Sequence, residues 1–315
     1  MHLDSAIVIM HSLPPFSMRL KGKMVSMSAN EHMAGRVCLV TGATSGIGKA
    51  TALGLAQMGA HVFMLGRNPD KLNATKLELD GSNPAGRLST LQCDLSSMAD
   101  IRRFAGEFMS TQPKLHALIH NAGVSPVQKH ETAEGFELTF AVNHLAPFLL
   151  THLLHDGMAH TDHSRIVCVS SSSHTRASLD FDNLQAEKGF KRGMKTYGHT
   201  KLMNLLFAFA LARRLQGTKT TVNAGHPGVV RTDLVRDVTG FPRLIIQCLR
   251  PFFLSPEEGA KTPIFLATDD SLEGVSGKYF SRFNEATPSA DALNRDHQER
   301  LWELSMQMAG LSDPS

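Results

Sequence analysis

From residue 36 onward, short apolar runs alternate with helix-length segments, and this alternation restricts the fold more than any other feature. The apolar runs are rich in β-branched and aliphatic residues, as buried strands are, and span 36–42, 61–65, 87–95, 115–123, 165–171 and 220–228. The segments between them span 46–59, 69–80, 97–111, 131–156 and 195–215. Because helices usually connect parallel strands, we predict an α/β fold: a doubly wound parallel sheet of about seven strands with helices on both faces.

The chain after residue 36 contains no low-complexity linker and no internal repeat, and 315 residues suit one large α/β unit. We therefore expect a single domain over 36–315, preceded by a poorly ordered N-terminal extension over 1–35. The extension is rich in Met and Ser and carries Arg19, Lys21 and Lys23. An organellar presequence, a disordered tail and an upstream start codon are three open interpretations of it.

Charge, hydropathy and cysteine spacing exclude several classes of protein. The net charge is only +3, with no dense block of Lys and Arg, so we expect no nucleic-acid partner. No apolar run reaches the ~18 residues that cross a bilayer, and none resembles a secretory signal, so we expect an intracellular protein, cytoplasmic or peripheral to a membrane. The cysteines lack metal-ligand spacing, so we expect free thiols and assign no metal: they are Cys38, Cys93, Cys168 and Cys248.

A glycine-rich turn, "TGATSGIG", follows the first apolar run and opens the first helical segment, with glycines at 42, 46 and 48. Glycine lets a backbone approach a phosphate closely, and the N–H groups of a helix N-terminus can bind the anion. An ordinary strand-to-helix turn is the alternative. The strand-turn-helix context favours a dinucleotide site of the Rossmann type.

The residues after the second apolar run indicate which dinucleotide is bound. NAD-binding units usually carry an acidic residue there that binds the ribose 2′-hydroxyl, but this chain has Gly66 and Arg67. A guanidinium can pair with a 2′-phosphate instead. We therefore predict NADP(H) in preference to NAD(H).

Tyr197, one of only two tyrosines, stands four residues before Lys201 in "TYGHTK". On a helix this spacing places both side chains on one face, one turn apart. The pair could carry out chemistry, or Tyr197 could be an amphipathic residue of the core.

In combination, the motifs from about Arg36 to Leu311 resemble those of the short-chain dehydrogenases/reductases, in the branch of the retinol dehydrogenases. In the family's order they are "TGATSGIG", "CDLSS", "NAG" at 121–123, "VNHLAPFLLTHLL", "VCVSSSS", "YGHTK" and "HPGVVRTDL". Each motif is weak alone, but seven in this order are not expected by chance.

The resemblance implies four catalytic residues. Tyr197 would be the general acid/base, and Lys201 would lower its pKa and bind the nicotinamide ribose. Ser171 would hold the substrate oxygen, with Ser172 as second candidate, because "VCVSSSS" offers four serines. Asn143 would support a water chain leading to Lys201, and a plain buried hydrogen bond is the alternative.

The resemblance also implies a cofactor site. Asp94 would bind adenine or else cap a helix, Pro227 and Gly228 would line the nicotinamide, and Thr232 would bind its carboxamide or a phosphate. The full set of expected cofactor-binding residues is Gly42, Thr44, Ser45, Gly46, Ile47, Gly48, Arg67, Asp94, Leu95, Asn121, Ala122, Gly123, Tyr197, Lys201, Pro227, Gly228, Val230 and Thr232.

An apolar segment around 233–254 stands where the family carries its substrate lid. A helix packed on the core is the alternative, and Arg243 and Arg250 also allow peripheral membrane contact. We therefore expect an NADP(H)-dependent oxidoreductase that interconverts a lipophilic aldehyde or ketone and its alcohol, with retinal and retinol as a candidate pair.

Other functions and assemblies stay open. The chain could be a carbonyl reductase for a non-retinoid substrate, or a catalytically silent NADP(H)-binding regulator, although a regulator would usually have lost Tyr197 or Lys201. A sugar-nucleotide epimerase would need a larger polar C-terminal domain than 229–315 supplies. The family often dimerises through the helices at 131–156 and 195–215, so a homodimer through them and burial of the apolar second helix within one chain are both open interpretations.

Overall fold

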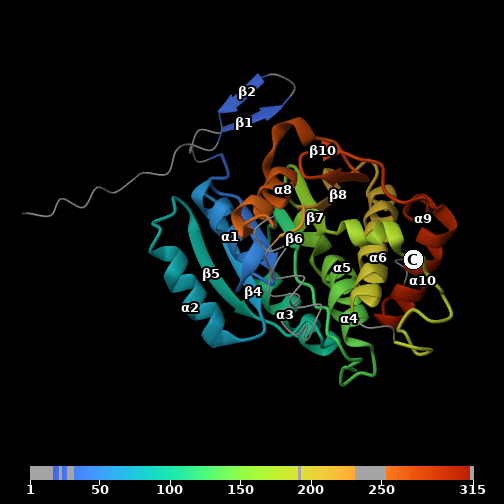
Figure 1. Ribbon diagram of the computed structural model, residues 1–315. Helices are drawn as coiled ribbons and strands as arrows, with labels where there is room; N and C mark the ends of the chain where they lie inside the picture. Colours follow the sequence, from blue (N-terminus) through green and yellow to red (C-terminus); the bar gives the residue numbers. More distant parts are fainter. Residues whose placement is uncertain (1–16, 21–22, 27–31, 191–192, 231–252, 313–315) are drawn as a thin grey trace, which may run out of the picture.

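The computed structural model describes residues 17–20, 23–26, 32–190, 193–230 and 253–312 (Figure 1). Several sequence predictions lie outside these residues. They concern Thr232, the part of the expected lid over 233–252 with Arg243 and Arg250, and Cys248.

An eight-stranded sheet forms the centre of the molecule in the order β10-β9-β8-β7-β6-β3-β4-β5. Its strands are β3 Val37–Thr41, β4 His61–Gly66, β5 Arg87–Gln92, β6 Ala117–His120, β7 Ser164–Val169, β8 Thr220–His226, β9 Lys278–Ser281 and β10 Asn284–Glu285. All neighbours are parallel except β9 and β10. The predicted doubly wound parallel sheet is confirmed, while β9 and β10 had no counterpart among the six apolar runs.

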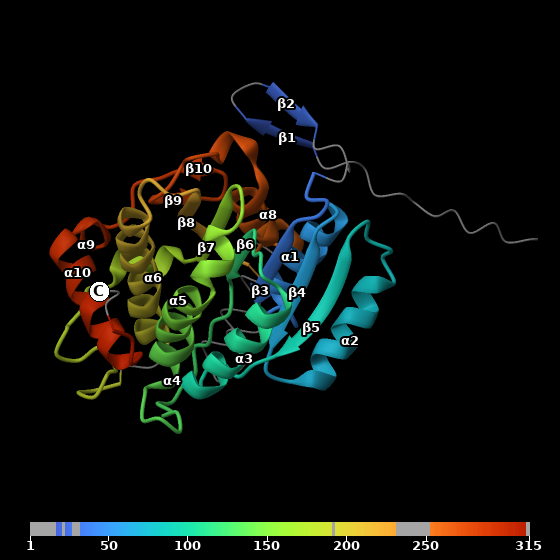
Figure 2. The same ribbon diagram turned by 180° about the vertical axis from the view of Figure 1, so that it is seen from behind.

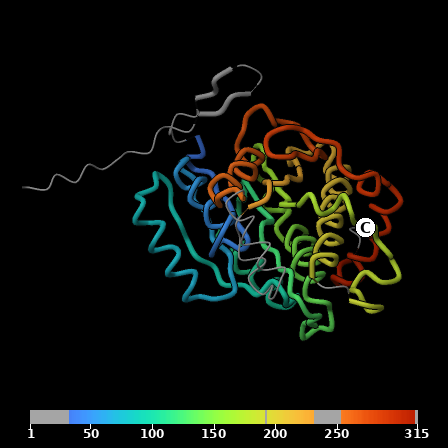
Figure 3. Tube along the Cα trace, viewed as in Figure 1, coloured from blue at the N-terminus to red at the C-terminus, as the bar shows by residue number. Residues whose placement is uncertain are grey.

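Helices cover both faces of this sheet (Figure 2). One face carries α1 Gly46–Gln57, α2 Pro69–Asp80 and α8 Pro256–Thr268, and the other carries α3 Met98–Thr111, α5 Ala146–Ala159, α6 Met194–Arg214 and α10 Arg295–Met308. Successive strand residues point to opposite faces, so Leu39 packs with α3 and α6 while Val40 packs with α1 and α8. Helices α1 and α8 lie side by side although they are far apart in the sequence (Figure 3), because Gly54 admits the Ile264 side chain.

The strand order reverses at β3, with β4 and β5 on one side and β6, β7 and β8 on the other. In open α/β sheets, ligands bind outside the carboxyl ends of the strands at such a reversal. The glycine-rich turn follows β3 and "NAG" follows β6, so this topology brings the two motifs together.

The predicted helix over 131–156 is wrong at its start. Helix α4, Leu138–Phe140, comes first, and a π-helical turn, η1 Ala141–Leu145, leads into α5. Before α4, Thr132 N donates to Phe136 O at 2.8 Å, which closes a turn. Gly135 in this turn has φ +82°, a left-handed conformation that is incompatible with an α-helix. The remaining short helices are η2 Ser172–Arg176, η5 Asp270–Leu272 and α9 Ala290–Leu293.

At the N-terminus, β1 Ser17–Leu20 and β2 Lys23–Ser26 form an antiparallel pair separate from the main sheet. Met33 is buried in the core, and its N–H donates to Met58 O at the end of α1 at 2.8 Å. Packing of the domain therefore begins shortly before residue 36. None of the described helices is both long and apolar enough to cross a membrane.

Candidate active site

The glycine-rich turn lies against the turn after β6, with no room for side chains. A Cβ on Gly48 would lie 2.3 Å from both Gly42 O and Asn121 Nδ2, and a Cβ on Gly42 would lie 2.9 Å from Ala122 Cα. Gly42 also has φ +67°, which favours glycine. The glycines at 42 and 48 are therefore required by close backbone approach, as the dinucleotide motif predicts.

Thr41, which sequence reasoning missed, fastens these two turns together. Its Oγ1 accepts hydrogen bonds from the N–H groups of Asn121 and Ala122, both at 3.0 Å, and Asn121 Nδ2 donates to Thr41 O at 2.8 Å. A hydroxyl at the end of an apolar strand, directly before Gly42, was the available signal.

The first turn of α1 follows directly. Ser45, the N-cap, is extended, and within the described residues its side chain caps no N–H of α1. Thr44 O accepts a hydrogen bond from Thr75 Oγ1 at 3.3 Å, and Ile47 packs close to Gly259 of α8. Because the Ser45 side chain does not cap them, the N–H groups at the start of α1 can bind a phosphate.

Arg67 and Asp94 lie at the carboxyl ends of β4 and β5. Arg67 Nη1 is 3.9 Å from Asp94 Oδ2, and 74% of the Arg67 side chain is exposed. A Cβ on Gly66 would lie 3.0 Å from Thr44 Cγ2, so the glycine turn leaves little room there for an acidic side chain. Ser97, not Asp94, caps α3, because Ser97 Oγ accepts from Asp100 N at 3.2 Å.

Tyr197 and Lys201 lie on one face of α6, as their spacing predicts. Lys201 Nζ is 5.4 Å from the centroid of the Tyr197 ring. Lys201 is 3% exposed, and its Nζ donates to Val169 O, at the end of β7, at 2.8 Å. A Cβ on Gly123 would lie 3.7 Å from Nζ, so the "NAG" turn borders the lysine.

The pKa values of this pair differ from the sequence expectation. Burial raises the pKa of Tyr197 to about 12, although a hydrogen bond with the Ser171 side chain opposes the rise. Burial also lowers the pKa of Lys201 to about 8, with a smaller opposing effect of Cys168. We expected Lys201 to lower the pKa of Tyr197, but desolvation of the phenol dominates.

The four serines after β7 have different environments. Ser170 Oγ donates to Lys201 O at 3.0 Å, and Ser172 is exposed. Ser171 interacts with the Tyr197 phenol, and its Oγ accepts from Ser173 N at 3.2 Å. The geometry therefore favours Ser171 over the second candidate, Ser172, as the partner of Tyr197.

Asn143 is fully buried in η1 and holds neighbouring segments together. Its Oδ1 accepts from Val124 N at 2.8 Å, and its Nδ2 donates to Val124 O and Thr200 Oγ1, both at 3.0 Å. These bonds join the turn after β6 to α6, so the side chain makes the buried hydrogen bonds that were the alternative to a water chain.

Asn204, one turn beyond Lys201, was not predicted from the sequence. With its amide nitrogen facing them, Asn204 donates to Asn143 O at 2.7 Å and to Thr200 O at 3.1 Å. In an α-helix the donor to Asn143 O would be residue 147, but Pro147 has no N–H. Asn204 therefore satisfies a carbonyl that the proline leaves without its helical partner.

After β8, Gly228 adopts φ +97°, and a Cβ there would lie 2.6 Å from Leu254 Cδ1. Val230 forms a parallel bridge with Leu254, and Leu254 N donates to Val229 O at 2.8 Å. Pro227 and Val230 thus stand at the same edge of the sheet as the glycine turn.

Histidines gather near the motifs at 120, 144, 174, 199 and 226. Within the described residues, no group of three or more His, Cys, Asp or Glu side chains is placed to hold a metal ion. Burial lowers the pKa of His120 and His144 to about 3 and that of His226 to about 4, so these rings are neutral at pH 7.

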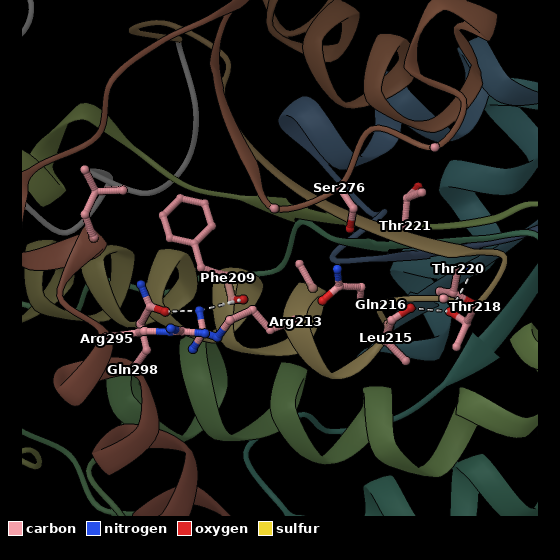
Figure 4. Close-up of a pocket in the computed structure, with 15 residues that line it drawn as sticks. Phe209, Arg213, Leu215, Gln216, Thr218, Thr220, Thr221, Ser276, Arg295 and Gln298 are labelled. Atoms are coloured by element: carbon pink, nitrogen blue, oxygen red, sulfur yellow. Dashed lines mark hydrogen bonds between the residues drawn. The ribbon is translucent and has the colours of Figure 1, made fainter.

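A groove of about 570 Å³ lies at the opposite edge of the sheet, where β8 begins (Figure 4). Its lining includes Thr220 of β8, Phe209 and Arg213 of α6, and Gln298 of α10. The Arg213 charge is already paired, because Nη2 donates to Glu299 Oε1 at 2.6 Å. Ligands of open α/β sheets bind at the carboxyl edge, so the candidate active site is the one around Tyr197.

Relatives were found both among protein sequences and among solved structures. The short chain dehydrogenase family model matches residues 36–241. Human retinol dehydrogenase 11 is 41% identical over 280 residues, covering 89% of this chain and 87% of that protein. Human dehydrogenase/reductase SDR family member 13 is 40% identical over 285 residues, covering 89% and 74%.

Solved structures with a similar fold were also found. A protein of unassigned function from Mycobacterium paratuberculosis superimposes with a TM-score of 0.73 at 29% identity, covering 90% of this chain and 96% of that one. A second structure comes from Beutenbergia cavernae, is described as an NAD(P)-dependent gluconate 5-dehydrogenase and holds NADP at low occupancy. It superimposes with a TM-score of 0.63 at 26% identity, covering 79% of this chain and 95% of that one.

The fold and the site together define a dinucleotide-dependent oxidoreductase with a Tyr-Lys pair. The chain belongs to the short-chain dehydrogenase family, and within it to the retinol dehydrogenase-like branch.

Proposed function

We propose that this chain is an NADP(H)-dependent oxidoreductase that interconverts a lipophilic aldehyde or ketone and its alcohol, with retinal and retinol as a candidate pair. The observation that carries the proposal is the convergence of Ser171, Tyr197 and Lys201 beside the glycine-rich turn. When bound, the reduced cofactor supplies the hydride.

Tyr197 donates the proton to the developing alkoxide. Its raised pKa keeps the phenol protonated at neutral pH, as a general acid requires. Ser171 Oγ accepts a hydrogen bond from Ser173 N, so its own proton is available for the phenol or the substrate oxygen. Lys201 supplies positive charge beside the phenolate that remains after proton transfer.

Exposed apolar side chains at this edge favour a lipophilic substrate. Val127 after β6, Met194 at the start of α6 and Val229 after β8 are 41%, 55% and 56% exposed. The loop before Val127 touches the start of α6, since a Cβ on Gly193 would lie 2.3 Å from Pro126 O. Several relatives at about 40% identity are named retinol dehydrogenases, which supports a retinoid-like substrate.

The test is NADPH oxidation with all-trans-retinal and a series of apolar aldehydes. Tyr197→Phe should lose roughly 10²- to 10⁴-fold in kcat, the range for general acid catalysis. Tyr279→Phe, which changes the other tyrosine in β9, is the matched control and should retain activity. NADPH binding without turnover of any aldehyde would contradict the proposal and favour a regulatory protein.

The preference for NADP(H) rests on Arg67, exposed at the end of β4, and on Gly66, which leaves little room for an acidic side chain. Arg67→Ala should weaken NADPH binding roughly tenfold and leave NADH binding within about twofold, since only NADPH carries the 2′-phosphate. Arg87→Ala, at the start of β5, is the control. Equal wild-type affinity for NADPH and NADH would refute the preference.

A further inference from the structure

His174 stands three residues after Ser171, in the short helix η2, and its side chain is fully buried at 0% exposure. It contacts neither Tyr197 nor Lys201 in any described hydrogen bond. Its ring packs edge-on against the ring of Tyr279 from β9, with centroids 5.0 Å apart. Because buried polar groups are normally hydrogen-bonded, the partners of this ring indicate its role beside the candidate catalytic serine.

Both ring nitrogens of His174 bind backbone groups. Nδ1 lies 2.6 Å from Ser171 O, and Nε2 lies 3.3 Å from Ser289 N, directly before α9. A carbonyl can only accept and an N–H can only donate, so Nδ1 carries the proton and Nε2 is bare. Burial lowers the pKa of the ring, which keeps it neutral and preserves both bonds.

The two bonds connect the catalytic loop to the C-terminal segment. Ser171 O also accepts from His174 N at 3.2 Å, so the Ser171 carbonyl is held by backbone and side chain of the same residue. With the peptide fixed in this way, Ser171 Oγ is held by Ser173 N at 3.2 Å and faces Tyr197.

Around His174, three buried polar atoms have no hydrogen-bond partner among the described residues: Ser173 Oγ, His226 Nδ1 and Ser289 Oγ. These three side chains therefore add no described hydrogen bond through those atoms to hold the loop. The Nδ1–H bond of His174, at 2.6 Å, is shorter than the backbone bond of His174 N to the same Ser171 carbonyl, at 3.2 Å.

We propose that His174 is a positioning residue for the reaction: its Nδ1–H fixes the Ser171 peptide so that Ser171 Oγ is aimed at Tyr197 and the substrate oxygen. The inference rests on the proposed function, because it assigns Ser171 a role in turnover. The bond of Nε2 to Ser289 N has a different role, which is to hold the C-terminal segment against the loop.

Two substitutions separate these roles. The amide nitrogen of Asn can take the place of Nδ1, and the carbonyl oxygen of Gln can take the place of Nε2. His174→Asn should therefore keep kcat within about threefold, while His174→Gln should lose roughly tenfold or more in kcat with KM nearly unchanged. Thermal unfolding should show similar losses of stability in both variants, since each loses one buried hydrogen bond.

A second measurement does not depend on activity. In ¹⁵N-histidine NMR, the signal that disappears in His174→Gln should belong to a neutral ring with its proton on Nδ1 at pH 7. A proton on Nε2, a charged ring, or equal kcat in the two variants would overturn the inference. A wild type without turnover would instead refute the proposed function, and the tautomer would still decide whether His174 holds Ser171.

Discussion

Lys201 combines a positive charge with almost complete burial. Its pKa falls from 10.5 to about 8 because the ammonium is removed from water, while Nζ donates a hydrogen bond to Val169 O at 2.8 Å. At about 1.4 kcal/mol per pKa unit, a charged Lys201 at pH 7 costs on the order of 3 kcal/mol of folding free energy. The residue is therefore better explained by chemistry than by stability.

The first prediction concerns the pH dependence of reduction. Lys201 is charged below pH 8 and neutral above it, so reductive kcat/KM should fall as the pH rises through about 8. Tyr197, with a pKa of about 12, stays protonated over this range. In Lys201→Arg, whose charge persists, the fall near pH 8 should disappear even if the rate is lower. An unchanged profile in that variant would assign the pKa to another group.

The second prediction concerns stability. Because the folded-state pKa of Lys201 is lowered, the folding cost is fully present below pH 8 and is lost between about 8 and 10.5. Lys201→Met should raise the free energy of unfolding by up to about 3 kcal/mol at pH 7, and by much less at pH 10. Urea unfolding at both pH values measures this, and lower stability at pH 7 would contradict it.

The third prediction tests the close approach of the two turns. A Cβ on Gly48 would lie 2.3 Å from Gly42 O, so Gly48→Ala should separate the turns and weaken NADPH binding at least tenfold. Gly106→Ala, at an exposed position of α3 with nothing within 4 Å of the added Cβ, is the control and should stabilise the protein by roughly 0.5–1 kcal/mol. Equal cofactor affinity in the two variants would exclude the steric argument.

At the scale of elements, the π-helical turn η1 shows how a helix can depend on a neighbour. Pro147 cannot donate to Asn143 O, and Asn204 of α6 donates to it instead. The Asn143 side chain in turn joins α6 to the turn after β6. Such π-helical turns are frequent at functional sites, and this one stands beside Lys201.

The fourth prediction follows from this arrangement. Asn204→Ala leaves a buried carbonyl without its donor and should cost about 1–3 kcal/mol of unfolding free energy. Asn73→Ala, on the exposed face of α2, should change it by less than about 0.5 kcal/mol. Denaturant unfolding of both variants provides the comparison, and a small effect at both positions would show that the carbonyl finds another partner.

The apolar helix α6 illustrates a second interaction between elements. Its side chains from Leu202 to Leu211 are buried within this one chain, partly under α10, where Arg214 stacks on Trp302 at 3.9 Å. Burial within the chain explains why α6 is apolar, so its apolar sequence is no longer evidence for a dimer interface. A homodimer therefore stays a prediction that rests on the family resemblance.

At the scale of the molecule, a cofactor bound between the two halves of the sheet should stabilise the entire fold. The fifth prediction is that NADPH at about 100 times its Kd adds about 2.7 kcal/mol of stability, which corresponds to roughly 5 °C in Tm. The same concentration of NADH should give a smaller shift, and Arg67→Ala should bring the two shifts together. A larger shift with NADH would contradict the proposed preference.

The sequence by itself determined the parallel sheet, the positions of its six main strands along the chain, the glycine turn and the Tyr197–Lys201 pair. These features depend on local periodicity, on the conformational freedom of glycine and on residue spacing along one helix. It did not predict β9, whose four residues begin with Lys278 and end with Ser281 and so form no apolar run, or β10, which has only two residues. It also did not predict the turn over 131–137, which Gly135 closes.

Only the tertiary structure decided the environment of the site. It raised rather than lowered the pKa of Tyr197, because burial of the phenol is a property of packing and not of the neighbouring lysine. The bonds of Thr41 to the turn after β6, of His174 Nε2 to Ser289 N and of Asn204 to Asn143 O join distant segments, and no spacing along the chain encodes them. Residue types and periods are local, whereas desolvation and long-range hydrogen bonds exist only once the chain has folded.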